Sequence, residues 1–396
     1  MSDPTPRWIW QTEAWPPLAY EGNAVQAALA SARNEFGRLQ GKVDAVGKAD
    51  LPQSERDIWT RDALATAAIE GETLNPDAVR SSVARRLGLT DTFTAAVPRN
   101  VEGLLDVMED AAGKFDDPLT EARLFAWHTE LFPPSQFSLH PITPGQYRTD
   151  DTPMQIVSGP AGQEKVHYVA PPAADIPALM GAFLVWFNAS RHDGSDGLVR
   201  AALAHLWFES IHPFEDGNGR VGRAIIDLAL SQDAGKSFRL HGLSHELRRR
   251  QAGYYDALNR VQRAEAKAET WLQWLLDTLQ QSCIRSSTLI DEALDRARFW
   301  SQHKHVSLNE RQRKLLTRML DAGPGRWKGG MTPRKAQSLT SAAGATATRD
   351  LTELVEKGLM VRRGAGRSTH YELALAGWEW RGSERAEDAG AGNLPA

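Results

Sequence analysis

Hydrophobic residues recur every three or four positions along most of the chain, which is the spacing of amphipathic helices. The clearest stripe lies between residues 23 and 46 and consists of Val25, Leu29, Ala32, Phe36, Leu39 and Val43. Similar patterns predict helices over 54–69, 101–114, 120–132, 176–188, 197–211, 220–231, 246–261 and 269–294. Asn75 followed by Pro76 predicts a further helix start, because Asn caps helices and Pro suits their first turn. The pattern therefore indicates a mainly α-helical protein.

The stretch from 133 to 172 breaks this helical pattern. Its many prolines and glycines exclude a long helix, since proline lacks the N–H that a helix interior needs. Two short runs of strand-forming residues, 154–158 and 165–169, lie on either side of Gly159-Pro-Ala-Gly162. A strand, a glycine-rich turn and a second strand predict a β-hairpin.

A second change of pattern follows residue 302 or so. Between 306 and 373 the chain carries 13 Lys and Arg against 6 Asp and Glu, a net charge of +7. Helical patterns over 309–320, 332–339 and about 346–358 precede two strand-like runs around a glycine turn in 359–373. This order predicts a separate, basic winged helix-turn-helix module.

Composition restricts the class of protein. The 396 residues have a formal net charge of −4, so the molecule as a whole is not a polycation suited to nucleic acid. The single cysteine, Cys283, excludes an intramolecular disulfide framework and a cysteine-based zinc finger. The longest apolar stretch, 176–187, has 12 residues, fewer than the roughly 20 that cross a bilayer. With no signal-peptide pattern at its start, the chain is expected to be cytoplasmic, without a membrane partner.

Tryptophan is unusually frequent, with 13 in the chain. Three of them, Trp8, Trp10 and Trp15, lie within the first fifteen residues. Large aromatic side chains bury much apolar area, so we expect these three to anchor the amino end onto a core.

The strongest candidate for chemistry is the string from His212 to Arg223, His-Pro-Phe-Glu-Asp-Gly-Asn-Gly-Arg-Val-Gly-Arg, between two predicted helices. Glycines before a helix start turn backbone N–H groups toward an anion, and the helix dipole favours negative charge there. Two arginines three residues apart, Arg220 and Arg223, can address one polyphosphate. Asp216 offers a hard oxygen ligand to Mg²⁺, and His212 is a candidate general base. We expect the Phe214 side chain to point into the core.

This string resembles the Fic family, whose motif is His-x-Phe-x-(Asp or Glu)-Gly-Asn-Gly-Arg-x-x-Arg, and every motif position is matched. The resemblance extends to Gly145-Gln-Tyr-Arg148, Tyr168-Val-Ala-Pro-Pro172 and Ala201-Ala-Leu-Ala-His205, and covers about 120–276. Fic proteins typically transfer AMP from ATP to a Ser, Thr or Tyr hydroxyl of a target protein. The resemblance thus implies ATP as substrate, Mg²⁺ as cofactor and a protein target, which can be the chain itself.

The same resemblance implies roles for individual residues. His212 would take the proton of the attacking hydroxyl, and Asp216 would hold Mg²⁺ on the departing pyrophosphate. The residues implied in nucleotide binding are Phe214, Gly217, Asn218, Gly219, Arg220, Arg223, Tyr254, Tyr255 and Gln262. Those of the flap that would align the target by strand addition are Ile156, Val157, Ser158 and Gly159. For the two tyrosines, packing of a helix in the core is an equally good interpretation.

A second motif precedes the Fic-like region. Thr66-Ala-Ala-Ile-Glu70-Gly71 matches the inhibitory motif of Fic proteins, (Ser or Thr)-x-x-x-Glu-(Gly or Asn). The C-terminal end of a helix is an unfavourable place for a carboxylate, so Glu70 needs a partner. By the resemblance, Glu70 would pair with Arg223 and occupy the place of the γ-phosphate, so that ATP binds in a geometry unsuited to transfer.

The remaining parts also resemble an arrangement known in Fic proteins. Residues 1–115 are expected to form an N-terminal helical domain with the inhibitory helix, 116–300 the Fic catalytic core, and 301–380 the winged helix. Residues 381–396 are expected to be a disordered tail. The winged helix would bind DNA through Arg349, Arg362, Arg363 and Arg367, or serve protein interaction or dimerisation. A homodimer is expected by the resemblance alone.

Three functions remain open from the sequence. The first is an autoinhibited protein adenylyltransferase. The second is a DNA-binding transcriptional regulator whose Fic core senses nucleotide, although His212 and Asp216 are both retained. The third is removal of AMP from a modified target, with Glu70 orienting a water. Relatives that use UTP, phosphocholine donors or phosphate transfer leave the nucleotide itself open, and the complete Gly-Asn-Gly-Arg loop favours ATP.

Overall fold

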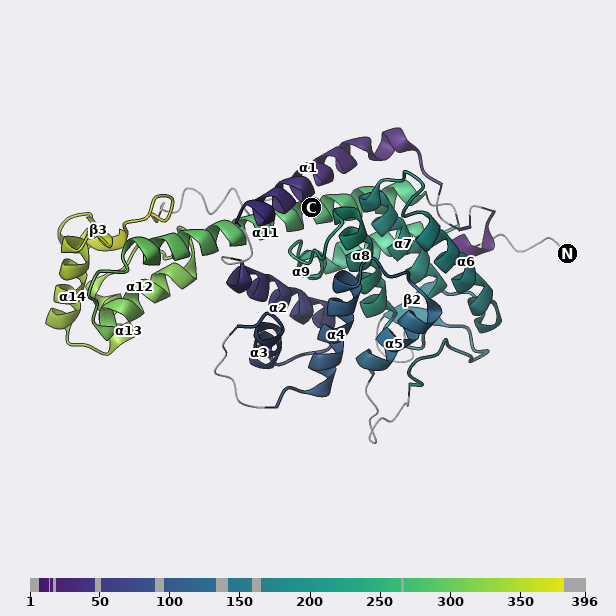
Figure 1. The fold of residues 1–396 in the computed structure, drawn as a ribbon, viewed down its shortest axis with the longest axis horizontal. Coiled ribbons are helices and arrows are strands. Elements are labelled where there is room, and N and C mark those ends of the chain that lie inside the picture. Colours follow the sequence, from purple (N-terminus) through teal and green to yellow (C-terminus); the bar gives the residue numbers. More distant parts are fainter. Residues whose placement is uncertain are drawn as a thin grey trace. The chain divides into compact units, whose positions relative to one another are not determined.

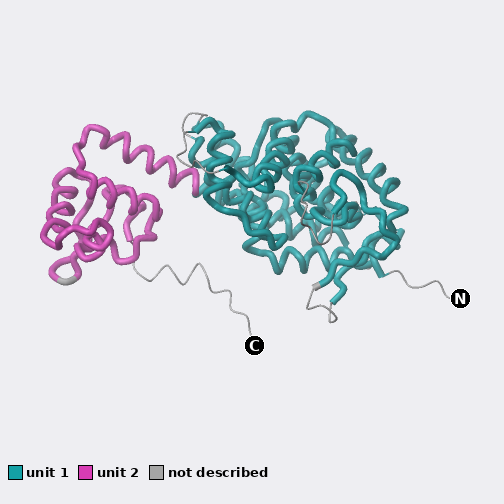
Figure 2. The backbone as a smooth tube through the Cα atoms, turned by 90° about the horizontal axis from the view of Figure 1, so that it is seen from below, with its two compact units in different colours: residues 1–288 teal, residues 289–396 magenta. Residues whose placement is uncertain are grey.

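The protein is mainly helical in the computed structural model, which describes residues 7–13, 15–16, 19–46, 51–89, 96–132, 142–158, 165–264 and 267–380. The chain divides into two compact units, residues 1–288 and 289–396 (Figure 2). The first unit contains the His212–Arg223 loop, and the second contains the basic C-terminal segment.

The first unit begins with a 3₁₀ turn, η1 (Ile9–Gln11), and the helices α1 (Gly22–Val46) and α2 (Pro52–Ile69). The stripe expected on α1 is buried at Val25, Ala32, Phe36 and Leu39. Helices α3 (Pro76–Arg86), α4 (Arg99–Gly113) and α5 (Glu121–Leu131) follow. The Asn75 cap is confirmed, because its side chain accepts the N–H groups of Asp77 and Ala78.

The expected hairpin consists of β1 (Gln155–Ser158) and β2 (Lys165–Val169), which pair antiparallel. Ile156 lies opposite Tyr168 and Val157 opposite Val166, with a bulge between Ile156 and Val157. The expected turn, Gly159-Pro-Ala-Gly162, and therefore the flap residue Gly159, lie outside the described residues. A 3₁₀ turn, η2 (Ala173–Asp175), leads from the hairpin into the next helices.

The centre of the unit is formed by α6 (Ile176–Ala189), α7 (Gly197–Ile211) and α8 (Asn218–Ala234), and α7 and α8 lie side by side (Figure 1). All residues of α7 from Leu198 to Ile211 are buried, so the loop after α7 starts from a rigid base. Helix α11 (Ala268–Gln302) begins in this unit and ends in the second one.

The prediction of a single helix over 246–261 is wrong. The chain forms α9 (Leu243–Arg249) and α10 (Gln251–Val261), separated at Arg250, which has φ −108° and ψ 26°. The Arg250 N–H binds the carbonyls of Glu246 and Leu247, and its guanidinium binds Asp277 and Thr278 of α11. A helix interruption of one residue leaves the hydrophobic periodicity almost unchanged. Because tertiary contacts fix this interruption, the sequence pattern did not predict it.

The second unit has α12 (Glu310–Ala322), α13 (Pro333–Thr340) and α14 (Gly344–Glu356), followed by β3 (Met360–Arg363), η3 (Gly366–Ser368) and β4 (His370–Leu373). Strands β3 and β4 pair antiparallel, with Met360 opposite Leu373. The buried core of this unit includes Leu315, Leu316, Leu351, Leu354 and Leu359. The tail expected at 381–396 lies outside the described residues.

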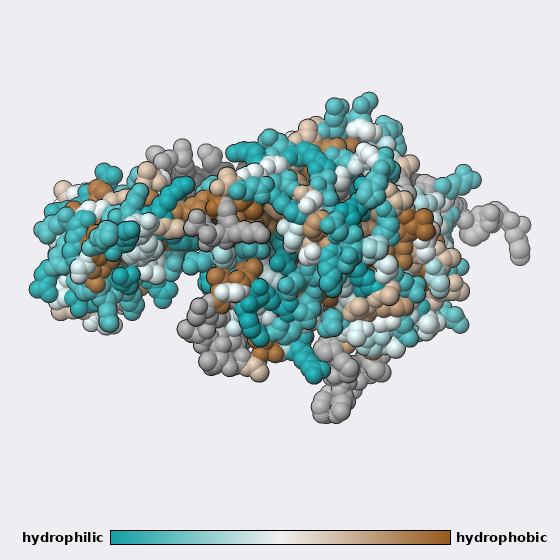
Figure 3. Space-filling model, in the orientation of Figure 1, coloured by the Kyte–Doolittle hydropathy of each residue, from teal (hydrophilic) through white to brown (hydrophobic). Residues whose placement is uncertain are grey.

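None of the helices in the described parts of the chain combines the length and apolar character needed to traverse a bilayer. Figure 3 shows mainly hydrophilic side chains on the face that it draws, interrupted by small hydrophobic areas. Val185 of α6 is 73% exposed, the largest exposed fraction among the described large hydrophobic side chains.

Candidate active site

The loop between α7 and α8 is built on two left-handed residues. His212 ends α7 with φ 52°, and Gly217 precedes the first residue of α8 with φ 80°. Positive φ is uncommon for a residue with a Cβ atom, so His212 is held there by its surroundings. At Gly217 a Cβ atom would lie 2.6 Å from the Phe132 ring, so glycine is required by space as well as by conformation.

Asn218 holds this loop closed. Its Oδ1 accepts the Phe214 N–H at 2.9 Å, and its Nδ2 donates to the Phe214 carbonyl at 2.8 Å. Phe214 itself is fully buried and stacks on the His128 ring, with centroids 4.2 Å apart. The amide and the ring thus fix the loop from inside, as expected for the Phe214 side chain.

Two residues outside the motif also position the loop. His128 of α5 accepts the Gly145 N–H at Nδ1 (3.0 Å), so its Nε2 carries the proton and donates to the Asp216 carbonyl (3.1 Å). The Arg148 side chain donates from Nε to the His212 carbonyl at 2.9 Å, and the Arg148 backbone N–H donates to the Pro213 carbonyl. Both side chains are buried, at 0% and 4% exposure. No function of either residue follows from the sequence pattern, although Arg148 ends the Gly145–Arg148 string.

The His212 imidazole lies in an environment that keeps it neutral. Burial lowers its pKa to about 4, and the positive charge of Arg148 acts in the same direction. The Glu209 backbone and the Glu70 charge oppose this shift. Burial, with a smaller contribution from Glu70, raises the pKa of Glu209 to about 8, so this neighbouring carboxyl is mostly uncharged at pH 7. A neutral imidazole can accept a proton, which suits a general base.

We therefore expect the His212 ring to remain neutral down to about pH 5 and to be half protonated near pH 4. The pKa is lowered from the ordinary 6.5, so protonation is displaced to more acidic pH. NMR titration of histidine-labelled protein, with the signal assigned by its loss in His212→Ala, measures this directly. Half-protonation near pH 6.5 would contradict the description of the site.

Asp216 and the start of α8 form the anion-binding face of the loop. The first N–H groups of a helix have no partner within it and attract negative charge. Asp216 is exposed, and its Oδ1 accepts the Gly217 N–H at 2.5 Å. No group of three or more His, Cys, Asp or Glu side chains in the described ranges could hold a metal alone. One carboxylate fits Mg²⁺ that is also bound by phosphates, which is how this ion is usually held.

Both arginines of the motif lie on the first two turns of α8 and are already bound by carboxylates. Arg223, 3% exposed, donates to Glu70 Oε1 at 2.8 Å and to the Thr66 hydroxyl and carbonyl. Its Nη1 is buried and has no hydrogen-bond partner among the described residues. Arg220 donates to Glu72 Oε2 at 3.0 Å and lies over the Phe132 ring. Glu72 belongs to no motif that the sequence shows.

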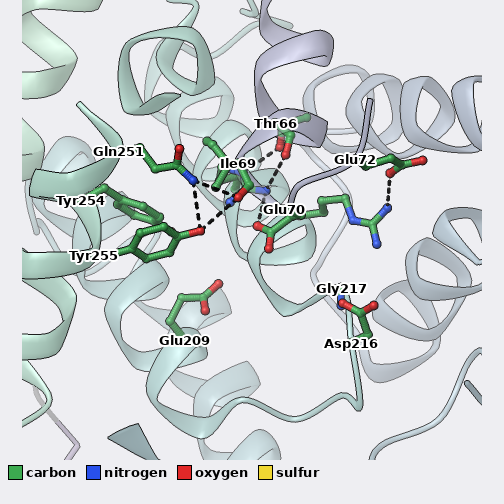
Figure 4. A network of polar contacts seen from close by, with 12 residues as sticks. Thr66, Ile69, Glu70, Glu72, Glu209, Asp216, Gly217, Gln251, Tyr254 and Tyr255 are labelled. Carbon is green, nitrogen blue, oxygen red and sulfur yellow. Dashed lines mark hydrogen bonds and ion pairs between the residues drawn. The ribbon is translucent and has the colours of Figure 1, made fainter. Parts of the chain in front are cut away.

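The carboxylates come from the end of α2 (Figure 4). Glu70 is the residue after the last helical position, and Gly71 follows with φ 78°, which turns the chain back toward the loop. Gln251 and Tyr255 of α10 both donate to the Ile69 carbonyl, at 3.0 and 3.1 Å. The end of α2 is thus held on the loop from two sides.

A cavity of about 960 Å³ opens beside the loop. Its lining includes His212 and Gly219 of the loop, Glu70 of α2, Ile156 and Val157 of the hairpin, and Tyr255 and Gln262 at α10. Such a volume suits a nucleotide-sized ligand. Tyr254 also reaches the lining, but it is 2% exposed and its hydroxyl is 2.8 Å from His205 Nε2.

Comparison with known proteins matches two parts of the chain. Residues 118–230 match the model of the Fic/DOC family, and residues 8–89 match a domain of unknown function, DUF4172. The first match contains the whole loop just described. Residues 118–230 form a Fic domain.

Curated relatives of this Fic protein include two proteins named protein adenylyltransferase Fic. The one from Culex quinquefasciatus is 25% identical over 212 residues, and the one from Aedes aegypti is 26% identical over 211 residues. Each match covers 50% of this chain and 38% of the relative, so the chain corresponds to well under half of their length. A Fic family protein from Desulfovibrio desulfuricans superposes with a TM-score of 0.51 at 22% identity, covering 91% of this chain and 98% of that one. That likeness concerns the fold alone.

The remaining sequence-predicted residues of this Fic protein lie in its second unit. Arg349 lies on α14 with a side chain 69% exposed, and its Nε is 3.9 Å from Glu353. Arg362 and Arg363 lie exposed on β3, and Arg363 Nε is 3.3 Å from Glu372. The side chain of Arg367 lies outside what the structure describes.

Proposed function

We propose that this Fic protein is a protein adenylyltransferase, which transfers AMP from ATP to a Ser, Thr or Tyr hydroxyl of a target protein or of itself. One observation carries the proposal: a neutral His212, an anion-binding helix start and two arginines share one loop. The adenylyltransferase names of relatives at about 25% identity support the same reaction class.

The reaction follows from the positions of these groups. His212 accepts the proton of the target hydroxyl, and the oxygen attacks the α-phosphorus of ATP. The bond from the α-phosphorus to the bridging oxygen breaks, and pyrophosphate leaves. The first N–H groups of α8 stabilise the charge on the transferring phosphoryl group. Asn218, whose amide binds both main-chain groups of Phe214, keeps this helix start in place.

The arginines would hold the outer phosphates. Arg223 reaches the site with an unpartnered Nη1, and Arg220 lies one helical turn earlier. Bidentate guanidinium groups match phosphate oxygens well. Asp216 is the residue that would hold Mg²⁺, which supplies neutralisation of the pyrophosphate charge. Tyr255 and Gln262 are the lining residues placed to contact the nucleoside.

We further propose that the end of α2 keeps this site inactive. Glu70 binds Arg223 and Glu72 binds Arg220, so both phosphate-binding side chains are occupied by carboxylates of the same chain. A Cβ on Gly219 would lie 2.2 Å from Glu70 Oε1, so this carboxylate lies directly against the loop. ATP must compete with Glu70 for Arg223, and its phosphates cannot adopt the transfer geometry while Glu70 stays.

Two labels on ATP test the reaction class. With the Glu70→Gly variant and Mg²⁺, protein should retain label from the α-phosphate and none from the γ-phosphate, because pyrophosphate leaves. Gel separation and counting of the protein band measure both. Retention of the γ-label would instead identify phosphate transfer and contradict the proposal.

A DNA-binding regulator is not proposed as a second function. Arg363 is paired with Glu372 and Arg349 lies near Glu353, so the positive charge expected to meet DNA is partly neutralised within the unit. A net charge of +7 over 306–373 gives non-specific attraction at most.

A further inference from the structure

The hairpin β1–β2 needs support from elsewhere in the chain. A two-stranded hairpin is only marginally stable in water unless another element covers one of its faces. The sheet has no third strand among the described residues, yet Ile156, Val157 and His167 of this hairpin line the active-site cavity. Its position therefore decides the shape of the cavity.

Tyr168 of β2 donates its hydroxyl to the Ser210 carbonyl of α7 at 2.6 Å, and further support comes from residues 7–11. Trp8 packs edge-on against Tyr168 of β2, with ring centroids 5.4 Å apart, and both rings are buried. The indole N–H of Trp10 donates to the Val169 carbonyl at 2.8 Å. Met154 and Ile156 pack against the same small hydrophobic cluster.

The same residues also bind the second wall of the cavity, at the end of α10. The Ile9 N–H donates to the Gln262 carbonyl at 3.0 Å, and the Ala264 N–H donates to the Arg7 carbonyl at 3.2 Å. Trp8 forms a β-bridge with Arg263, whose guanidinium lies 5.0 Å from the Trp8 ring centroid. Gln262 and Arg263 both line the cavity.

Hydrogen bonds to the Gln11 side chain hold residues 7–11 in a defined turn. Its Oε1 accepts the N–H groups of Arg7 and Trp8, each at 3.0 Å, and Ile9–Gln11 forms a 3₁₀ turn. A turn with its own hydrogen bonds that touches two walls can set the distance between them.

We propose that residues 7–11 are a clamp that fixes the hairpin and the end of α10 relative to each other, with Trp8 and Trp10 as positioning residues for substrate binding. The proposal that residues 7–11 hold the two cavity walls rests on the contacts described above. Its consequence for catalysis rests on the proposed adenylyltransferase function. None of the contacts described for Trp8 and Trp10 involves His212, Arg220 or Arg223, so the effect falls on KM and not on kcat.

Hydrogen–deuterium exchange of the full chain in the Glu70→Gly background tests the clamp. Trp10→Phe removes the indole donor and keeps a smaller aromatic ring, and exchange in peptides covering β1 and β2 should rise about fivefold. Trp8→Ala removes the packing, and exchange there should rise at least about tenfold. Trp186→Phe is the matched control, since Trp186 packs on Trp207 and should leave the hairpin unchanged.

Steady-state labelling with Mg-ATP provides the second readout. Trp10→Phe should raise the apparent KM for ATP at least about threefold and leave kcat within about twofold.

Unchanged hairpin exchange in both tryptophan variants overturns the clamp, whatever the transfer activity of these variants. Faster hairpin exchange with unchanged KM overturns the positioning role. If Trp8→Ala raises exchange throughout the first unit, the exchange of Trp10→Phe alone tests the clamp. Absence of transfer in the Glu70→Gly parent refutes the proposed function, and the exchange data still decide the clamp.

Discussion

Replacing Glu70 with glycine should raise the rate of AMP transfer at least about a hundredfold, which corresponds to roughly 2.7 kcal/mol in the barrier. Glu70 Oε1 lies 2.8 Å from Arg223 Nη2 and against Gly219, where the proposed reaction requires the outer phosphates of ATP. Glycine removes the carboxylate and leaves the Arg223 guanidinium bound, among the described residues, only to Thr66. Incorporation of α-labelled ATP into protein, measured as initial rates for wild type and variant, gives the ratio.

Glu72→Gln is the matched comparison for this experiment. Glu72 binds Arg220 at 3.0 Å, and glutamine keeps the size of the side chain while removing its charge. Arg220 is more exposed than Arg223, at 9% against 3%, so solvent weakens the Glu72 pair more. We expect a rise of about two- to tenfold. Equal transfer by wild type and Glu70→Gly would show that the end of α2 is not inhibitory.

Replacing His212 with alanine in the Glu70→Gly background should lower transfer at least about a thousandfold, since a positioned base contributes 10²–10⁴-fold. Its imidazole is neutral and ready to accept the hydroxyl proton. Affinity for Mg-ATP should stay within about twofold, because the helix start and the two arginines hold the phosphates. Initial rates of labelling and isothermal titration calorimetry measure the two effects separately.

The conformation of His212 makes a second variant necessary. Its φ of 52° is unfavourable for alanine, and asparagine adopts this region more readily. His212→Asn should therefore keep the loop and nucleotide affinity while losing transfer to the same extent. Parallel loss of ATP affinity in both variants would mean that His212 is a structural residue of the loop.

The parts of the site that are local in sequence were the most predictable. Helix ends, the two glycines and the spacing of Arg220 and Arg223 are properties of one continuous segment, so their type and order indicate an anion site. The pairing of Glu70 with Arg223 joins residues 153 positions apart. No pattern of hydrophobic residues encodes such a contact, and only the family resemblance suggested it.

Contacts decided by tertiary packing could not be read from the sequence. Glu72 looks like an ordinary surface carboxylate, and its partner Arg220 is 148 positions away. His128 gains its role from stacking on Phe214, and Arg148 from reaching the His212 carbonyl. Tyr254 and Tyr255 are adjacent, yet one is buried against His205 and the other is 40% exposed and binds the Ile69 carbonyl. The two tyrosines differ because the packing of α10 buries one side chain and exposes the other.

The central claim is that one loop performs AMP transfer with His212 as base while Glu70 inhibits it. The most direct measurement compares wild type, Glu70→Gly and Glu70→Gly/His212→Ala after incubation with Mg²⁺ and α-labelled ATP, counting label on the protein. We expect little label on wild type, strong label on Glu70→Gly and none on the double variant. Equal label on Glu70→Gly and the double variant would contradict it.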